Sequence, residues 1–340
     1  MRAPTVPSAL VLGGLLLLGA LVSLTRGAMT IPAGDSLLAL ADVLLGSSTA
    51  ELATHQRAVI LELRLPRTLL AIFIGAILAQ CGAAMQGMFR NPLADPGIIG
   101  VSAGAAVGAV LAIYLAPADE AWWSVPLGAF SAGLATSLLI YKLARGSSGT
   151  SVFILLLAGI AISALAGAFI GFITYLSDDT RLRDLSLWQM GSLASADGPR
   201  VWIAMLAFAL LALRLQRHAA ALNALLLGEA EARHLGIDVE SLKRELVILV
   251  ALGVGLAVSA AGVIGFVGLV VPHFVRMLAG PCHHGLLPLS ALCGGLLLLI
   301  ADVAARLLLA PAELPVGILT ALLGAPFFIL LLFQQKQRSA

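Results

Sequence analysis

Most of the side chains that could do chemistry in this chain gather in one polar segment between two long apolar runs. Residues 229–245 hold eight Asp, Glu, Lys or Arg side chains in 17 positions. Elsewhere the sequence avoids charge, since only 11% of its residues are charged. A dense polar segment has no favourable place inside lipid. We therefore interpret it as a surface that an otherwise apolar protein offers to a partner in water.

A second set of ionisable residues lies within apolar runs. Asp302 and Arg306 are four residues apart, so on a helix they share one face and can pair. Ionisable groups inside membrane helices are functional candidates by default. A proton relay needs a chain of acids through the spans, and only Asp302 lies clearly inside one. This pattern argues against a proton-coupled carrier.

Several kinds of catalytic site are missing from the sequence. No G-x-x-x-x-G-K-[ST] loop occurs, because residues 146–150 (GSSGT) lack the lysine, so we expect no ATP site. No H-E-x-x-H motif or Cys/His cluster occurs, and the three cysteines suit packing roles. His273 and the pair His283–His284 suit capping, packing or solvated positions better than metal ligation. We expect neither an enzyme nor a resident metal or cofactor.

The composition places the chain in a membrane. Of its 340 residues 60% are hydrophobic, and the mean hydropathy is +1.03. Soluble domains are about 45–50% apolar and about 25% charged. A net charge of +2 gives no reason to expect a nucleic acid partner. The fold class is therefore an all-α polytopic protein of the lipid bilayer, because spanning helices pair their own backbone groups.

Ten apolar windows are long enough to cross about 30 Å of hydrocarbon as helices. The first follows Arg2, and we interpret it as a retained span because it is long for the apolar core of a signal peptide. The seventh and eighth are hard to separate, since 262–278 suits one broken helix or parts of two. The windows are 9–25, 68–88, 97–115, 124–143, 152–175, 200–215, 246–264, 266–280, 286–309 and 316–333.

Ten crossings place both termini on one side of the membrane. That side carries 12 of the 20 Lys and Arg residues, so the positive-inside rule predicts cytoplasmic termini. On this topology the polar segment is cytoplasmic, and the loops 26–65 and 176–199 face outward. Glycines at helix-packing spacing also predict close contacts between spans. They are Gly100, Gly104, Gly108, Gly167 and Gly171.

Five motifs follow one another along the chain. They are 64–67 (RLPR), 82–97 (GAAMQGMFRNPLADPG), 227–236 (LGEAEARHLG), 265–273 (GFVGLVVPH) and 301–317, which contains ADVAAR and ELPVG. Together they resemble the permease subunits of bacterial type II ABC importers for iron–siderophores, haem and vitamin B12. The resemblance runs from about residue 60 to 333, nearly the whole chain.

The resemblance implies a single transmembrane permease domain over 1–340, in the bacterial inner membrane. It implies a homodimer, two cytoplasmic ATPase subunits and a periplasmic binding protein, and the missing ATP site follows because the partners would hydrolyse ATP. A cytoplasmic coupling segment would cover 216–245. There a short helix, with Leu235 and Ile237 as apolar contacts, suits docking into a groove of the ATPase. The coupling residues would be Gly228, Glu229, Ala232, Arg233, Leu235 and Gly236.

The resemblance also assigns three arginines to binding-protein docking. Arg64, Arg67 and Arg306 would accept carboxylates of the periplasmic protein. All three face outward on the topology predicted from the Lys and Arg count. Arginine suits this role because its planar fork holds a carboxylate through two parallel hydrogen bonds, and such pairs steer association.

The substrate path should lie along the fifth span and the loop that follows it in this family. Its candidates are Phe169, Phe172, Tyr175 and Met190, although helix packing explains the aromatic residues equally well. The stretch 181–193 (RLRDLSLWQMGSL) is most similar to haem permeases. An aromatic, weakly polar wall with outer arginines suits a planar apolar ring with two propionates. Haem is thus the expected transported substrate.

Other functions stay open at this point. A ferric siderophore or vitamin B12 would use the same class of importer. An ion-coupled secondary transporter would need the acid relay that is missing, and an intramembrane enzyme or channel would need a nucleophile or filter motif that is also missing.

Overall fold

The computed structural model describes residues 5–27, 29–46, 52–146 and 149–339. These ranges form helices and one short two-stranded turn. The elements are α1 (Thr5–Thr25), α2 (Ala33–Leu45), α3 (Thr54–Ala58), the π-helix η1 (Val59–Arg64), α4 (Leu65–Phe89), η2 (Pro96–Ile99), α5 (Val101–Leu115), η3 (Ala118–Glu120), α6 (Ala121–Ala144), β1 (Arg145–Gly146), β2 (Gly149–Thr150), α7 (Val152–Leu176), α8 (Asp179–Gln189), α9 (Gly198–Arg217), α10 (Ala219–Leu225), α11 (Glu229–His234), α12 (Val239–Ala261), α13 (Val267–Ala279), α14 (His283–Leu308) and α15 (Val316–Ser339).

The ten predicted windows correspond to ten helices. Seven described helices are long and apolar enough to cross a membrane, and α5, α13 and the described apolar part of α15 are shorter. The seventh and eighth windows are two separate helices, α12 and α13, divided by residues 262–266. The all-α membrane fold and its approximate span count are thus confirmed.

The polar segment and the outer loops are more helical than the sequence predicted. The α12 helix begins at Val239 rather than at 246, because the Asp238 carboxylate accepts a hydrogen bond from Ser241 N–H (3.0 Å) and caps it. The loop predicted over 26–65 contains α2, α3 and η1, and that over 176–199 contains α8. The helices α2 and α8 are too short or too polar to register as spans. The α3 and η1 helices run without a gap into α4 and form one 36-residue apolar stretch with it, so the second span begins earlier than the predicted residue 68.

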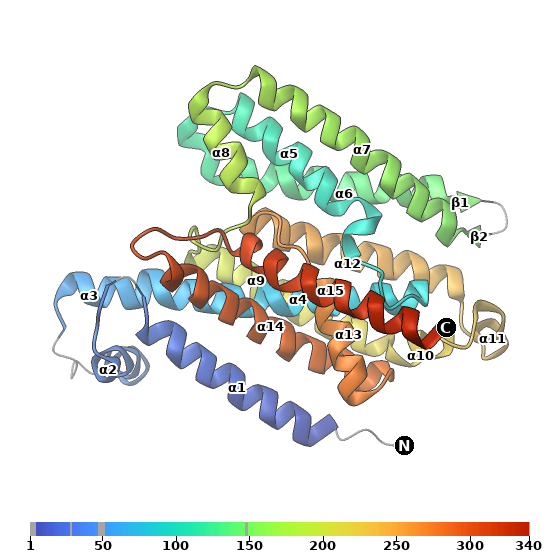
Figure 1. The fold of residues 1–340 in the computed structure, drawn as a ribbon, viewed down its shortest axis with the longest axis horizontal. Coiled ribbons are helices and arrows are strands. Elements are labelled where there is room, and N and C mark those ends of the chain that lie inside the picture. Colours follow the sequence, from blue (N-terminus) through green and yellow to red (C-terminus); the bar gives the residue numbers. More distant parts are fainter. Residues whose placement is uncertain (1–4, 28, 47–51, 147–148, 340) are drawn as a thin grey trace.

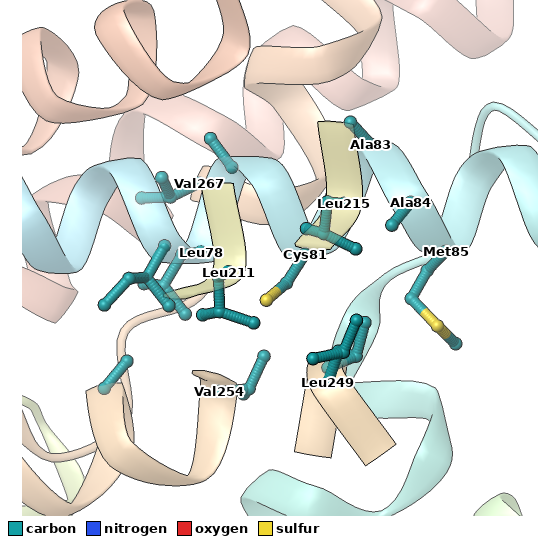
Figure 2. Packing of buried hydrophobic residues seen from close by; sticks show 14 of the residues in the cluster. Leu78, Cys81, Ala83, Ala84, Met85, Leu211, Leu215, Leu249, Val254 and Val267 are labelled. Atoms are coloured by element: carbon teal, nitrogen blue, oxygen red, sulfur yellow. The ribbon is translucent and has the colours of Figure 1, made fainter. Parts of the chain in front are cut away.

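The centre of the molecule is α4, which packs against α9, α12, α13 and α14. Figure 2 shows part of this core, where Cys81 of α4 lies near Leu211 of α9 and Val254 of α12. Close backbone approach fixes the packing on another face. A Cβ on Gly82 would lie 1.8 Å from the carbonyl oxygen of Gly268 in α13. Only glycine permits this contact.

A second layer, formed by α5, α6 and α7, lies beside α12 (Figure 1). The predicted packing of Gly100, Gly104 and Gly108 is confirmed, since each faces atoms of α6 at short distance. Gly167 and Gly171 differ, because a Cβ on either would meet nothing within 4 Å. Their face of α7 is open in one copy of the chain, so the prediction of close packing there is wrong within a single subunit.

The two ends of the helix bundle carry different elements (Figure 1). The start of α1, the end of α15, α10, α11, β1 and β2 lie at one end, here named the α11 end. The helices α2, α3 and α8 lie at the opposite end, here named the α8 end. Termini that share one end agree with an even number of crossings.

Candidate functional site

A buried cluster of charges lies at the α8 end, centred on Arg67. Its Nε donates to Asp302 Oδ1 at 2.8 Å, and its Nη1 donates to Glu313 Oε2 at 2.7 Å. Asp302 is fully buried, whereas the Glu313 side chain is 40% exposed. One guanidinium therefore joins an interior carboxylate to one that water reaches.

Arg306 and Arg64 complete this cluster. Arg306 Nε lies 3.1 Å from Asp302 Oδ2, so the predicted pairing of these residues is confirmed. The direction of this contact does not meet hydrogen-bond geometry, so it is an ion pair only. Arg306 also donates to Ser23 Oγ (2.6 Å), and Arg64 Nη1 donates to the Leu24 carbonyl (3.0 Å). Both arginines thus hold the end of α1.

Local structure explains why these residues meet. Pro66 lacks the N–H that an α-helix would need at that position, and the preceding turn is the π-helix η1, which ends at Arg64. Asp302 and Arg306 lie one turn apart on α14, which packs along α4. The loop after α14 then returns Glu313 to Arg67.

The three predicted docking arginines line one cavity of about 460 Å³, together with Glu313. The structure therefore brings together Arg64, Arg67 and Arg306 as the sequence predicted. It also gives each of them a partner inside the chain and leaves each less than 10% exposed. Their docking role stays a prediction, and the cavity is the place where a carboxylate from outside would reach them.

At the α11 end, the predicted coupling segment 216–245 contains α10, the short helix α11 and the start of α12. The predicted coupling residues lie in and around α11. Glycines with positive φ bound it, Gly228 at 125° and Gly236 at 83°. Leu235 is 64% exposed, as expected of an apolar contact, and Leu227 is 68% exposed. Ile237 instead packs partly against the core, so it anchors the segment rather than presenting an apolar surface.

The remaining coupling residues face the protein or the solvent. Ala232 is fully buried, and Arg233 is exposed beside Glu229, with 3.3 Å between Nη2 and Oε2. Glu229 turns inward, since its Oε1 lies 2.7 Å from Nζ of Lys243. The exposed apolar surface of this segment is therefore formed by the leucines that flank α11, while Glu229 fixes the helix to the chain. Its role in coupling stays a prediction.

The predicted path residues lie on or beyond the outer half of α7. Phe172 and Tyr175 are exposed, and Phe169 packs partly against the small cluster of Val110, Ile173 and Leu185. Met190 follows α8 and is also exposed. Helix packing within one chain therefore accounts for Phe169 and not for the other two aromatic residues. Among the described residues, no group of three or more His, Cys, Asp or Glu is placed to hold a metal ion.

The match of the chain to a protein-family profile agrees with this architecture. The profile of the FecCD transport family matches residues 15–334. The chain belongs to the FecCD transport family.

Individual members of the FecCD family and solved structures support this assignment. The hemin transport system permease protein HmuU of Yersinia pestis is 50% identical over 286 residues, 82% of this chain and 84% of that protein. The vitamin B12 import system permease protein BtuC of Salmonella paratyphi A is 41% identical over 323 residues, 95% of this chain and 94% of that protein.

Among solved structures, a metal-chelate type ABC transporter in an inward-facing conformation superposes with a TM-score of 0.83 at 34% identity. The superposition covers 96% of this chain and 98% of that one. PsaBC from Streptococcus pneumoniae has a TM-score of 0.56 at 18% identity over 78% of this chain and 89% of that one, which shows the fold alone.

Two residues of this FecCD permease make contacts that the sequence did not predict. Glu313 drew notice only as part of the ELPVG motif, although an acid beside a helix break in a charge-poor chain is a signal. Lys243 was one charge among eight in the polar segment, yet it is 2% exposed. Burial of a lysine is visible only once the helices are assembled.

Proposed function

We propose that this chain is the permease subunit of an ATP-driven importer that carries haem from the periplasm to the cytoplasm across the bacterial inner membrane. The observation that supports haem most directly is the 50% identity to a hemin transport permease over 82% of the chain. The chain provides the pathway, and no covalent step takes place in it.

The α8 end suits arrival of the cargo. A periplasmic binding protein would dock over the cavity of Arg64, Arg67 and Arg306, whose guanidinium groups bind carboxylates in a fork geometry. Two copies of the chain would face each other through the open side of α7, where Phe172 and Tyr175 are exposed. An aromatic surface of this kind suits a planar apolar ring, and weak contacts allow release.

The α11 end suits binding of the ATPase subunits. Leu227 and Leu235 are exposed apolar residues that flank a charged helix, the composition of a docking surface for a partner's groove. Two ATPase subunits would bind there, one to each copy. ATP binding and hydrolysis would move the coupling helices, and the central path would open to one side and then to the other.

Vitamin B12 is the second candidate cargo. The B12 permease matches a larger share of this chain, 95%, although its identity is lower at 41%. A ferric siderophore is the third, as another cargo of this class of importer. Neither changes the proposed mechanism, because all three would use the same docking cavity and coupling segment.

The test of cargo is the ATPase rate of the complete complex with a loaded binding protein. The permease, its ATPase subunits and the binding protein are reconstituted, and the binding protein is supplied empty or with haem, a ferric siderophore or vitamin B12. We expect haem to stimulate hydrolysis most. Stimulation by vitamin B12 without stimulation by haem would overturn the choice of cargo and leave the importer class intact.

A further inference from the structure

Lys243 is a buried cation at the α11 end that the proposed transport cycle does not yet use. It lies one turn into α12, and only 2% of the residue is exposed. A charged group taken out of water is unfavourable unless close partners compensate for the lost hydration. Its close contacts must therefore compensate for the hydration that the ammonium group has lost.

Three separate elements supply these contacts. Nζ lies 2.7 Å from Glu229 Oε1 at the start of α11, and it donates to the backbone carbonyl of Thr150 in β2 at 3.0 Å. It also lies 3.3 Å from Glu240 Oε1, one turn earlier on α12. One ammonium group thus joins the coupling helix, the α12 helix and the turn between α6 and α7.

The contact with Thr150 leads directly into α7. Glu240 Oε2 accepts hydrogen bonds from the backbone N–H and the hydroxyl of Thr150, at 2.8 and 2.7 Å. The next residue, Ser151, caps α7 by accepting from Ile154 N–H at 3.3 Å. The residue that Lys243 contacts is therefore two positions before Val152, the first residue of the helix that carries Phe172 and Tyr175.

These contacts should persist while the protein moves. If α11 shifted alone, the buried Lys243 ammonium would lose its shortest contact, the one to Glu229 Oε1 at 2.7 Å, and would keep only Glu240 and the Thr150 carbonyl. Loss of a charged partner by a buried cation is unfavourable. The favourable alternative is that α11, the start of α12 and Thr150 move together. A displacement of the coupling helix then reaches the base of α7 through contacts of a few ångströms.

We propose that Lys243 is a positioning residue that transmits movement of the coupling helix α11 to α7, through Glu229 on one side and Thr150 on the other. This inference rests on the proposed function, since it needs a partner that moves α11.

The test uses the complex of this permease with its ATPase subunits and follows the far end of α7. A spin label is placed at Leu176→Cys, an exposed position at the end of α7, after Cys81, Cys282 and Cys293 are replaced. The measured quantity is the change in the label's spectrum when a non-hydrolysable ATP analogue binds. The key variant is Lys243→Met, which keeps an unbranched side chain one heavy atom shorter and removes the charge.

We expect the nucleotide-dependent change to fall about threefold or more in Lys243→Met, while the ATPase subunits still co-purify. A lysine that only stabilises the fold would lower the melting temperature and leave the spectral change intact, and that result overturns the inference. If the label does not respond to nucleotide with Lys243 present, α7 does not move with the coupling helix and the inference fails. The ATPase rate of the same complex with haem-loaded binding protein tests the proposed function separately.

A second variant covers the case in which Lys243→Met does not assemble. Glu229→Gln keeps the side-chain length and an acceptor oxygen and removes only the charge, so the response should fall by about half or more. An unchanged response in Glu229→Gln contradicts the inference. The matched control is Arg214→Gln, which removes an exposed ion pair with Glu245 (3.4 Å) at the same end and should leave the response unchanged.

Discussion

Asp302 is a carboxylate without exposed surface that pairs with two guanidinium groups. Its carboxylate lies 2.8 Å from Arg67 and 3.1 Å from Arg306 and has no exposed surface. In Asp302→Asn, two buried cations lose their shared counter-charge. We expect the free energy of unfolding in detergent micelles to fall by about 3–5 kcal/mol.

Thermal unfolding of the purified subunit measures this loss. The control is Arg181→Gln, because Arg181 is 45% exposed and 3.7 Å from Asp178 at the same end of the molecule. Such surface pairs contribute about 0–1 kcal/mol. Equal losses of unfolding free energy in the two variants would show that the buried cluster stabilises the fold no more than a surface ion pair does.

Glu313 competes for the arginine that a binding protein would use. It occupies Arg67 Nη1 at 2.7 Å while 40% exposed. Glu313→Gln should therefore free part of the guanidinium and tighten docking of the binding protein by roughly 2–5-fold at low salt. The dissociation constant, measured with the subunit in detergent, checks this prediction.

Asp178→Asn is the matched control for Glu313→Gln, since it alters an exposed acid at the α8 end that does not line the arginine cavity. It should leave docking unchanged. Weaker binding in Glu313→Gln would mean that Glu313 supports the docking surface rather than competing for it.

At the scale of elements, α4 and α13 pack through a direct backbone contact between Gly82 and Gly268. A Cβ on Gly82 would lie 1.8 Å from the Gly268 carbonyl oxygen, so Gly82→Val must push the two helices apart. Overpacking of this kind costs about 1–3 kcal/mol, and more where the clash is with backbone. The melting temperature should fall clearly for Gly82→Val and remain unchanged for Gly13→Ala, whose Cβ would meet nothing within 4 Å.

Two exposed leucines flank α11, and the proposed function assigns them to contact with the ATPase subunits. Leu235 is 64% exposed and contributes little to the core, so Leu235→Asp should spare the fold. It should weaken association with the ATPase subunits by about 2 kcal/mol, or roughly 30-fold. Co-purification at graded ATPase concentration measures the effect. Association that survives this change would place the docking surface elsewhere.

The sequence was sufficient to predict elements that depend on composition. The ten spans follow from apolar length, and the pairing of Asp302 with Arg306 follows from helical spacing. It was insufficient for features that depend on assembly. The inward turn of Glu229, the burial of Lys243 and the return of Glu313 to Arg67 each join residues that are far apart in the sequence or lie on different elements, and no local pattern encodes such a meeting.

At the scale of the whole molecule, the two charged sites lie at opposite ends of the bundle (Figure 1). The arginine cavity belongs to the α8 end, and the α11 helix with Lys243 belongs to the other. The α7 helix spans the distance between these ends, with an open face along its length. This arrangement suits a protein in which events in the cytoplasm must change access from outside.

ATP-dependent uptake into liposomes tests the central claim most directly. The permease and its ATPase subunits are reconstituted with ATP enclosed, and the haem-loaded binding protein is added outside. We predict that haem accumulates inside only when ATP and all three kinds of subunit are present. Uptake by the permease alone, driven by an ion gradient without ATP, would contradict the account.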